Sequence, residues 1–328
     1  MRYIENAHTS RPYSKIGLGT WQFGSREWGY GADYDDREAA RLVRRALELG
    51  VTVFDTAELY GFGRGERILG AALRTALEAA GVLREEVVVA TKILPLLPVA
   101  PVVEQRAVAS AARLDVGGID LYQVHQANPV VRDSTTMRGM ASLRRAGVIR
   151  DVGVSNYSLA RWRQAEAALG APVLANQVQY SLVAREPEHD LLPYAEGADR
   201  IVIAYSPLAQ GLLSGRYDAQ RRPVNAARAL NPLFLPDNLE RVRPLLDTLR
   251  EVADAHDAEP SQIALAWAIR HPSVVAIPGA ASVEQLESNV AAADIKLTDG
   301  EYAALSDASH RFTPVTWPTA LPRLLRRR

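Results

Sequence analysis

The sequence predicts an α/β fold, a single (β/α)8 barrel domain over residues 1–328. Short runs rich in Val and Ile alternate with amphipathic helical segments, which gives eight strand–helix units. The runs are continuously apolar, as is typical of parallel strands buried on both faces. The turn Gly17–Trp21 lacks the third glycine of a dinucleotide-binding fingerprint, and no Walker motif is present. Eight such units favour a closed barrel over a doubly wound sheet.

Each expected element follows from its local pattern. Asp35 or Asp36 is suited to cap the first helix, which Gly50 ends. The expected strands are Lys15–Thr20, Val51–Phe54, Val87–Lys92, Ile119–His125, Asp151–Asn156, Val173–Gln177, Ile201–Tyr205 and Val274–Ile277. Helices are expected near 36–49, 65–80, 102–114, 133–146, 158–169, 188–196, 239–255, 261–270 and 282–292. The segment Ser206–Asp237, after the seventh strand, contains Pro, Gly and Arg and shows no clear period.

The composition restricts the classes of function. Lys plus Arg and Asp plus Glu number 38 each, so no net basic charge attracts nucleic acid. Cysteine is absent, which excludes disulfides, thiol nucleophiles and thiolate metal sites and fits a cytoplasmic protein. No apolar run reaches the roughly 20 residues of a membrane span, and the N-terminus lacks the apolar core of a signal peptide. The basic tail Arg323–Arg328 is interpreted as a solvated terminus.

Polar or reactive residues follow the apolar part of every expected strand. These residues are Trp21, Asp55, Lys92, His125, Ser155 with Asn156, Gln177, Tyr205 and Gly279. In a barrel all the strand ends meet at one rim, where active sites are built. A single buried His or Lys is explained by packing, but eight polar positions at one rim are costly without a functional reason. The pattern therefore predicts an active site at this rim.

Three of these side chains, Asp55, Lys92 and His125, suggest one kind of chemistry together with Tyr60. Tyr60 lies five residues after Asp55, and a tyrosine, with a pKa of about 10, donates a proton readily only if its anion is stabilised. The Lys92 ammonium supplies that stabilisation, and a carboxylate keeps the lysine charged. The set then forms a proton donor for a carbonyl oxygen under hydride attack, to which His125 also donates a hydrogen bond. The hydride requires a nicotinamide cofactor.

No metal site is expected, because the spacing of Asp55, His125 and His271 matches no zinc pattern. Trp21, Tyr60 and His125 are the expected substrate contacts. Trp28, Tyr30 and Trp317 are further candidates for an apolar pocket wall, although packing explains each equally well.

At this point the chain resembles the aldo-keto reductase family, in particular the branch that includes bacterial reductases and potassium-channel β subunits. The resemblance covers essentially the whole chain, and its motifs occur in the family's order. They are Gly17–Trp21, Phe54–Ala57 with Tyr60-Gly61, Thr91-Lys92, Val124-His125, Gly153–Tyr157, Asn176–Tyr180, Ala204–Leu208 and Ile277–Gly279 with Gln285-Leu286 and Asn289.

The resemblance implies a catalytic tetrad of Asp55, Tyr60, Lys92 and His125, with Tyr60 as general acid. It implies that Ser155, Asn156 and Gln177 hold the nicotinamide carboxamide, that Tyr205 stacks on its ring and that the Ser206–Asp237 loop covers the cofactor. The full set of implied cofactor-binding residues is Thr20, Trp21, Asp55, Ser155, Asn156, Gln177, Tyr205, Ser206, Pro207, Leu208, Gln210, Gly211, Ser214, Arg216, Gly279, Ala281, Gln285 and Asn289.

Two departures from the family pattern concern the cofactor. Ala280 and Ala281 stand where many members carry Lys or Arg for the 2′-phosphate of NADP, and Ser288 replaces a common Glu. A 2′-phosphate needs charged partners, which Arg216, Arg221, Arg222 or Arg228 can supply from the loop. NADPH is therefore expected in preference to NADH.

The expected function is the reversible NADPH-dependent reduction of a small aldehyde or ketone. One alternative is a regulatory or redox-sensing subunit that binds NADP(H) with little turnover. Another is a lyase in which Lys92 forms a Schiff base. The identity of the carbonyl compound and the oligomeric state stay open.

Overall fold

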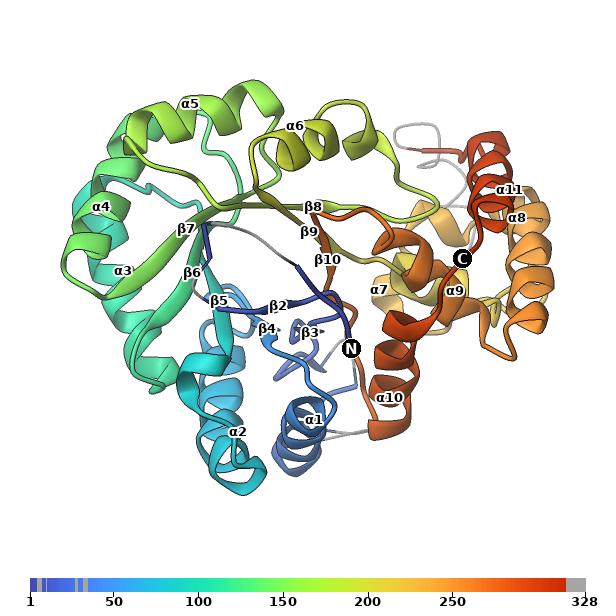
Figure 1. Ribbon diagram of the computed structural model, residues 1–328, viewed down its shortest axis with the longest axis horizontal. Coiled ribbons are helices and arrows are strands. Elements are labelled where there is room, and N and C mark those ends of the chain that lie inside the picture. The colour runs from blue at the N-terminus through green and yellow to red at the C-terminus, as the bar shows by residue number, and fades with distance from the viewer. Residues whose placement is uncertain (5–7, 10, 27–28, 32–34, 317–328) are drawn as a thin grey trace.

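The architecture is a parallel eight-stranded sheet curled into a barrel with helices around it (Figure 1). The computed structural model describes residues 1–316 apart from 5–7, 10, 27–28 and 32–34. Strands are hydrogen-bonded in chain order from β3 to β10, and all seven pairings are parallel. The strands are β3 (Leu18–Gly19), β4 (Val53–Asp55), β5 (Val88–Ile93), β6 (Ile119–Val124), β7 (Ile149–Ser155), β8 (Ala175–Gln179), β9 (Ile201–Tyr205) and β10 (Val274–Ala276).

Two isolated parallel bridges close the sheet into a barrel. Ile16 pairs with Ala276 and Gly19 pairs with Gly279, which joins the first and last strands. A side chain on Gly19 would place its Cβ 2.6 Å from the Ile277 carbonyl oxygen, so the seam requires a glycine. The predicted (β/α)8 barrel is confirmed. The expected first strand Lys15–Thr20 contributes only Leu18–Gly19 to the regular ladder, because its other pairing is made through these bridges.

Helices surround the sheet and bury their apolar faces against it (Figure 1). Asp35 caps the first helix as predicted, since its side chain accepts hydrogen bonds from the backbone N–H groups of Arg37 and Glu38. The α-helices are α1 (Asp36–Glu48), α2 (Arg64–Ala80), α3 (Ala100–Leu114), α4 (Asp133–Arg145), α5 (Leu159–Leu169), α6 (Leu191–Gly197), α7 (Ala226–Ala229), α8 (Pro236–Ala255), α9 (Pro260–Ala268), α10 (Val283–Ala291) and α11 (Asp299–Arg311).

The N-terminal end of the barrel is covered by a hairpin that the sequence did not predict. Its strands β1 (Tyr3–Ile4) and β2 (Tyr13–Ser14) pair antiparallel. Ile4 and Tyr13 pack on the apolar side chains inside the barrel, such as Leu121. The polar strand ends lie at the opposite rim, among the βα loops.

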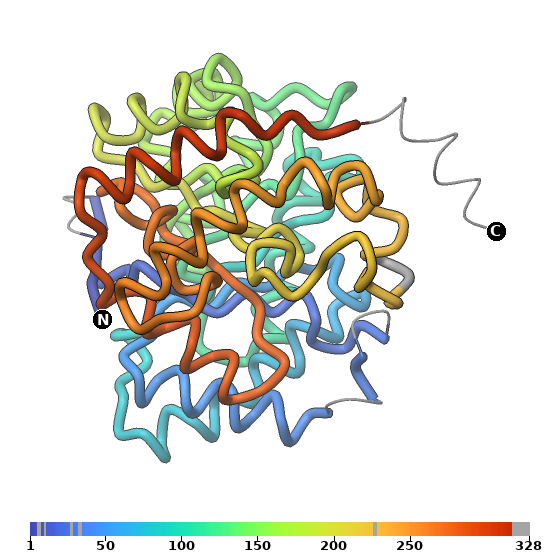
Figure 2. Tube along the Cα trace, turned by 90° about the vertical axis from the view of Figure 1, so that its right-hand side faces the viewer, coloured from blue at the N-terminus to red at the C-terminus, as the bar shows by residue number. Residues whose placement is uncertain are grey.

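The chain after β9 contains short helical turns where no periodic structure was expected. They are η4 (Ala209–Ser214), α7 and η5 (Pro232–Phe234). Leu212, Leu213 and Phe234 are buried, so the segment is anchored to the barrel. Helix α11, which was also not predicted, lies beside α8 in both views (Figures 1 and 2).

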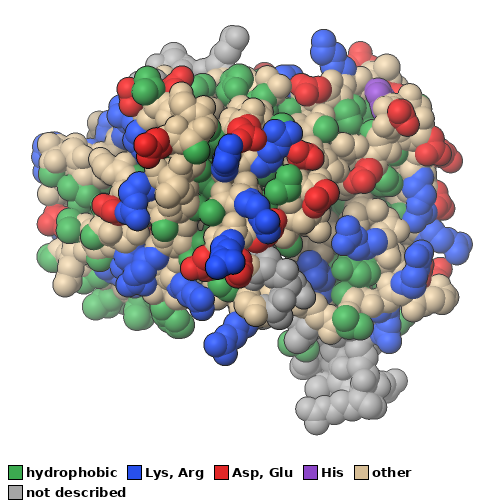
Figure 3. Space-filling view, turned by 90° about the horizontal axis from the view of Figure 1, so that it is seen from below, with side chains coloured by type: hydrophobic (Ala, Val, Ile, Leu, Met, Phe, Trp, Pro, Cys, Tyr) green, Lys and Arg blue, Asp and Glu red, His purple; other side chains and the backbone are tan. Residues whose placement is uncertain are grey.

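The face of the molecule drawn in Figure 3 carries side chains of both charges. Acidic and basic side chains are interspersed there, in keeping with the balanced composition. Of the helices that the structure describes, none combines the length and the apolar character needed to cross a bilayer.

Candidate active site

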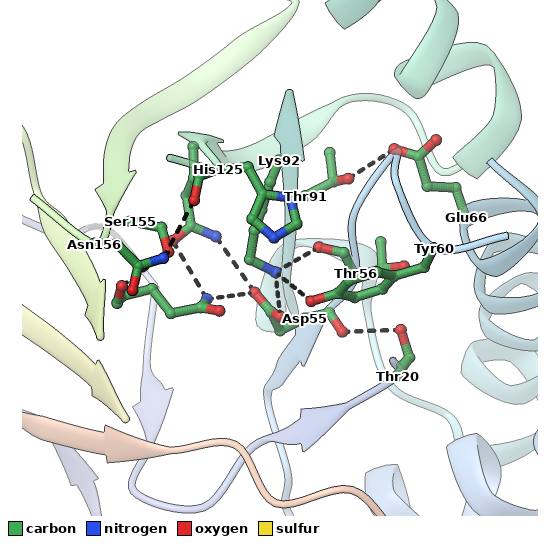
Figure 4. Close-up of polar contacts among 12 residues, drawn as sticks. Thr20, Asp55, Thr56, Tyr60, Glu66, Thr91, Lys92, His125, Ser155 and Asn156 are labelled. Atoms are coloured by element: carbon green, nitrogen blue, oxygen red, sulfur yellow. Dashed lines mark hydrogen bonds and ion pairs between the residues drawn. The ribbon is translucent and has the colours of Figure 1, made fainter. Parts of the chain in front are cut away.

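Four predicted side chains meet at this rim, and three of them are placed by the end of a strand (Figure 4). Asp55 is the last residue of β4, Lys92 lies near the end of β5 and His125 directly follows β6. Tyr60 lies in the turn between β4 and α2, and its side chain points toward Lys92. Because parallel strands end on one side, residues far apart in the sequence come together.

Lys92 is the centre of this cluster. Its side chain is fully buried, and its Nζ lies 2.5 Å from Asp55 Oδ1, 2.8 Å from the Thr56 carbonyl oxygen and 3.4 Å from the Tyr60 hydroxyl. An ammonium group has three donors, and all three have partners. The lysine is therefore held by the carboxylate and the backbone and is directed at the phenol.

Burial and charge act in opposite directions on the cluster. Burial alone would lower the pKa of Lys92, but Asp55 and Tyr60 outweigh it, and the pKa is raised. The ammonium therefore stays charged. Burial raises the pKa of Tyr60 above its usual value, and the attraction of Lys92 offsets only part of that rise. The sequence predicts that Lys92 lowers the pKa of Tyr60, and the charge of Lys92 does act in that direction. Burial has the larger effect, so the pKa of Tyr60 is raised overall.

Asp55 is held by two amides as well as by Lys92. Gln177 Nε2 donates to Asp55 Oδ2 at 2.8 Å, and Gln123 Nε2 donates to the same oxygen at 3.3 Å. Gln123 is fully buried and was not predicted as a site residue. Its signal was available, since it lies two residues before His125 in β6 and therefore on the same face. Gly153 leaves room for it, because a Cβ there would lie 2.8 Å from Gln123 Cγ.

His125 is neutral in this environment. Burial, and then the positive charge of Lys92, lower its pKa to about 3. Its Nδ1 is buried and finds no hydrogen-bond partner among the described residues. The imidazole ring meets the Tyr60 ring edge-on, with centroids 5.9 Å apart. A neutral imidazole donates one hydrogen bond but is not a proton source near pH 7.

We expect the pH profile of the reaction to show no ionisation of His125 between about pH 5 and 8. The folded-state pKa of about 3 lies below the ordinary value of 6.5, so the ring stays unprotonated throughout that window. In the same window the raised pKa of Tyr60 keeps the phenol protonated. The measurement is kcat/KM against pH for the carbonyl reduction that the sequence predicts. An inflection near pH 6.5 that disappears in His125→Gln would contradict the prediction.

Beside this cluster lie the polar groups predicted to hold a nicotinamide. Ser155 donates to the Gln177 carbonyl oxygen at 2.8 Å, and Asn156 Nδ2 lies 3.1 Å from the Ser155 hydroxyl. The Tyr205 hydroxyl donates to Asn156 Oδ1 at 3.0 Å. Asn156 has a φ of 58°, a conformation that few side chains adopt. Asn156, Ser155 and Tyr205 thus lie close together at the ends of β7 and β9. Gln177 in β8, between these strands, connects them to Asp55.

The first part of the loop after β9 is a turn with an unusual number of positive φ angles. Ser206, Ala209, Gln210 and Gly211 all have positive φ values, between 49° and 93°. Backbone N–H groups in such successive conformations form concave nests for anions. Two of these N–H groups are bonded within the loop, Ala209 to the Ser206 carbonyl and Gly211 to the Leu208 carbonyl. The turn directly follows Tyr205, the last residue of β9.

The turn after β10 is held by two of the predicted residues. Asn289 Nδ2 lies 3.3 Å from the Gly279 carbonyl oxygen, and Gln285 accepts from the Ala281 N–H at 3.0 Å. The Gln22 side chain packs against Gly279, where a Cβ would lie 2.8 Å from Gln22 Oε1 and displace it. The bridge between Gly19 and Gly279 brings this turn next to the Thr20 end of β3.

The other predicted residues that the structure describes differ in burial and in contacts. Thr20 donates to the Asp55 carbonyl oxygen at 2.9 Å. The Trp21 ring is 46% exposed and stacks on Tyr60, with centroids 6.3 Å apart. Arg216 is exposed at the end of the η4 turn. Tyr30 is buried, and Trp28 and Trp317 lie outside the described residues. No group of three His, Cys, Asp or Glu residues suited to a metal occurs in the part of the chain that is described.

Sequence comparison identifies the family of the chain. The family model described as "Aldo/keto reductase family" matches residues 15–310. The chain is 58% identical over 303 residues to an uncharacterised oxidoreductase of Mycobacterium tuberculosis, covering 92% of this chain and 91% of that protein.

Solved structures agree as well. A glycerol dehydrogenase from Gluconobacter oxydans superimposes with a TM-score of 0.83 at 29% identity, covering 96% of this chain and 97% of that one. An aldo-keto reductase from Klebsiella pneumoniae in complex with NADPH gives a TM-score of 0.72 at 30% identity, covering 93% and 94% of the two chains. This chain therefore belongs to the aldo/keto reductase family and is an NAD(P)H-dependent oxidoreductase.

Proposed function

We propose that the protein reduces a small aldehyde or ketone to the alcohol with NADPH, and that Tyr60 supplies the proton. The observation that carries the proposal is the buried Lys92, whose ammonium is fixed by Asp55 and directed at the phenol of Tyr60. A bound nicotinamide supplies the hydride for such a reduction. The residues of this chain then have to orient the carbonyl and stabilise its oxygen as negative charge develops there.

Tyr60 is suited to be the general acid. Its hydroxyl is the group at the rim that is both protonated at neutral pH and next to a fixed positive charge. As the phenol gives its proton to the substrate oxygen, the tyrosinate that forms is stabilised by Lys92 at close range. Asp55 keeps Lys92 charged and in place through their ion pair. The Asp55 carboxylate is itself fixed by hydrogen bonds from Gln177 and Gln123. Asp55 acts in this proposal through Lys92 and not as an acid.

His125 completes the site as a neutral hydrogen-bond donor to the substrate oxygen. Its low pKa excludes it as the acid near neutral pH. The rings of Trp21, Tyr60 and His125 contact one another, with Tyr60 between the other two. Their apolar faces form one side of the substrate site and keep water from the developing oxyanion.

Three parts of the rim would hold the cofactor. Ser155, Asn156 and Gln177 would take the nicotinamide carboxamide and Tyr205 its ring. The positive-φ turn Ser206–Gly211 would take the pyrophosphate, and the Gly279–Ala281 turn with Gln285 and Asn289 would take the adenosine. The further proposed contacts are Thr20, Trp21, Asp55, Pro207, Leu208, Ser214 and Arg216.

The NADPH preference is expected to depend on Arg216. Replacing Arg216 with Ala should weaken NADPH binding about ten- to hundredfold and change NADH binding little. Only NADPH carries the 2′-phosphate, and a charged hydrogen bond contributes about 1.5–3 kcal/mol. Arg216 is exposed, and no hydrogen bond or ion pair links it to the described residues, so its charge is available. The measurement is fluorescence titration with both cofactors.

Arg221→Ala is the matched control. Arg221 lies on the same loop, but its guanidinium is already paired with Asp218 at 2.9 Å. Its removal should leave both affinities within about twofold, since a partly neutralised exposed charge contributes little. Equal affinities of the unmodified protein for NADPH and NADH would overturn the proposed cofactor preference.

The function is tested by following NADPH oxidation with a panel of aliphatic, aromatic and sugar-derived carbonyl compounds. The proposal requires turnover with at least one class. Bound NADPH that is never oxidised by any of them, even in a single turnover, would favour the sensing subunit instead. If borohydride traps substrate on Lys92 by reducing a Schiff base, the lyase would be favoured instead.

A further inference from the structure

Glu66 is a buried carboxylate that the proposed reaction does not use. Its side chain is fully buried in the first turn of α2. Oε1 accepts a hydrogen bond from the Thr91 hydroxyl at 2.7 Å, and Oε2 lies 2.5 Å from Arg113 Nε. A carboxylate is costly to bury unless its partners are well placed.

The hydrogen bond between Thr91 and Glu66 links the strand of Lys92 to the segment of Tyr60. Thr91 directly precedes Lys92 in β5, and because strand side chains alternate, it points toward α2 while Lys92 points into the barrel (Figure 4). Glu66 lies six residues after Tyr60, and the Gly65 N–H donates to the Tyr60 carbonyl oxygen at 3.0 Å. One hydrogen bond thus joins the segment that carries the acid to the strand that carries its lysine.

Arg113 adds a third anchor from the last turn of α3. Its guanidinium also donates to the Ser110 hydroxyl at 2.9 Å. It reaches Glu66 by passing against Gly63, where a Cβ would lie 2.6 Å from Arg113 Nε. The glycine in the loop after Tyr60 therefore provides the space in which the anchor lies.

We propose that Glu66 is a positioning residue, which fixes the Tyr60 loop against β5 through Thr91 and Arg113 and so sets the distance between Tyr60 and Lys92. Asp55 and the Thr56 carbonyl already hold Lys92, so Tyr60 is the partner left to move. The separation of 3.4 Å is near the outer limit of a hydrogen bond, and a small displacement would break it. The inference rests on the proposed function of Tyr60.

The test compares four single variants of the full-length protein, Glu66→Gln, Thr91→Val, Thr91→Ser and Glu78→Gln. Single-turnover oxidation of bound NADPH by the best carbonyl substrate is measured for each. Glu66→Gln and Thr91→Val should each slow the step by about ten- to hundredfold, since misplacement on the order of 1 Å has effects of this size. Thr91→Ser keeps the hydroxyl and should stay near the unmodified rate. Glu78→Gln changes an exposed carboxylate of the same helix and should have no effect.

Two readouts separate positioning from a general loss of structure. In Glu66→Gln and Thr91→Val the NADPH affinity should stay within about twofold of the unmodified protein, because neither Glu66 nor Thr91 is a proposed cofactor contact. The double variant Glu66→Gln with Thr91→Val should be no slower than the worse single variant, since both changes loosen the same side chain at position 66, one from Arg113 and the other from Thr91. If Glu66→Gln fails to fold, Thr91→Val alone still decides. Unmodified rates in Thr91→Val, or equal losses of rate and NADPH affinity, would overturn the proposal.

A measurement without turnover distinguishes this inference from the proposed function. The titration of Tyr60 is followed by the ultraviolet difference absorbance of tyrosinate, with the signal of Tyr60→Phe subtracted. In Thr91→Val the pKa of Tyr60 should rise further, because the offset from Lys92 weakens with distance. An unchanged titration would contradict the positioning role even if no carbonyl substrate is ever found. Absence of turnover in the unmodified protein would instead contradict the proposed reduction.

Discussion

Replacing Tyr60 with Phe is expected to slow carbonyl reduction about 10³-fold, within the range for removal of a positioned general acid. Phe retains the ring that lies between Trp21 and His125, so only the hydroxyl is lost. NADPH affinity should stay within about twofold. The measurement is the single-turnover rate of NADPH oxidation with saturating substrate, which separates chemistry from product release.

Tyr122→Phe provides the matched control for Tyr60→Phe. The Tyr122 hydroxyl is buried in β6 and finds no hydrogen-bond partner among the described residues. Its removal should therefore leave the rate unchanged and the fold at least as stable. Full activity of Tyr60→Phe would mean that another group gives the proton.

Replacing Lys92 with Met is expected to affect both catalysis and stability. The reduction rate should fall by at least about 10³-fold, because the tyrosinate loses its stabilising charge. The free energy of unfolding should fall by about 3–5 kcal/mol, because Asp55 is left as an uncompensated buried charge. Urea unfolding with linear extrapolation measures the second effect.

The double variant Lys92→Met with Asp55→Asn separates the two effects. Removing the orphaned charge should recover part of the lost stability and none of the lost rate. The exposed Lys296→Met is the control for the loss of a lysine, and it should alter neither quantity. If Lys92→Met unfolds at the same urea concentration as the unmodified protein, the buried ion pair does not have the structural role assigned to it.

The barrel was predictable because its signals are local and repeated. Continuous apolar strands, helix caps such as Asp35 and breaks such as Gly50 recur along the chain, and their boundaries differ from the structure by a few residues. The hairpin β1–β2 was missed because two-residue strands leave no period to detect. Helix α11 was also missed, although Thr298 and Glu301 form a capping box that signals its start.

The candidate site was predictable in its members but not in its connections. Strand ends identify Asp55, Lys92 and His125, since topology alone brings them together. The sequence does not tell that Gln177 bonds Asp55, because the contact joins residues 122 positions apart. Nor does it tell that burial outweighs Lys92 in setting the pKa of Tyr60, which depends on how tightly the loops close over the phenol.

The most direct test of the proposed reduction follows the hydride itself. The protein is incubated with an aldehyde found in the substrate screen and with NADPH that carries deuterium at both C4 positions of the nicotinamide, and the alcohol is analysed by mass spectrometry. The proposal predicts one deuterium on the former carbonyl carbon of each alcohol molecule and a solvent proton on its oxygen. An alcohol formed without deuterium, or NADPH consumed without alcohol, would contradict it.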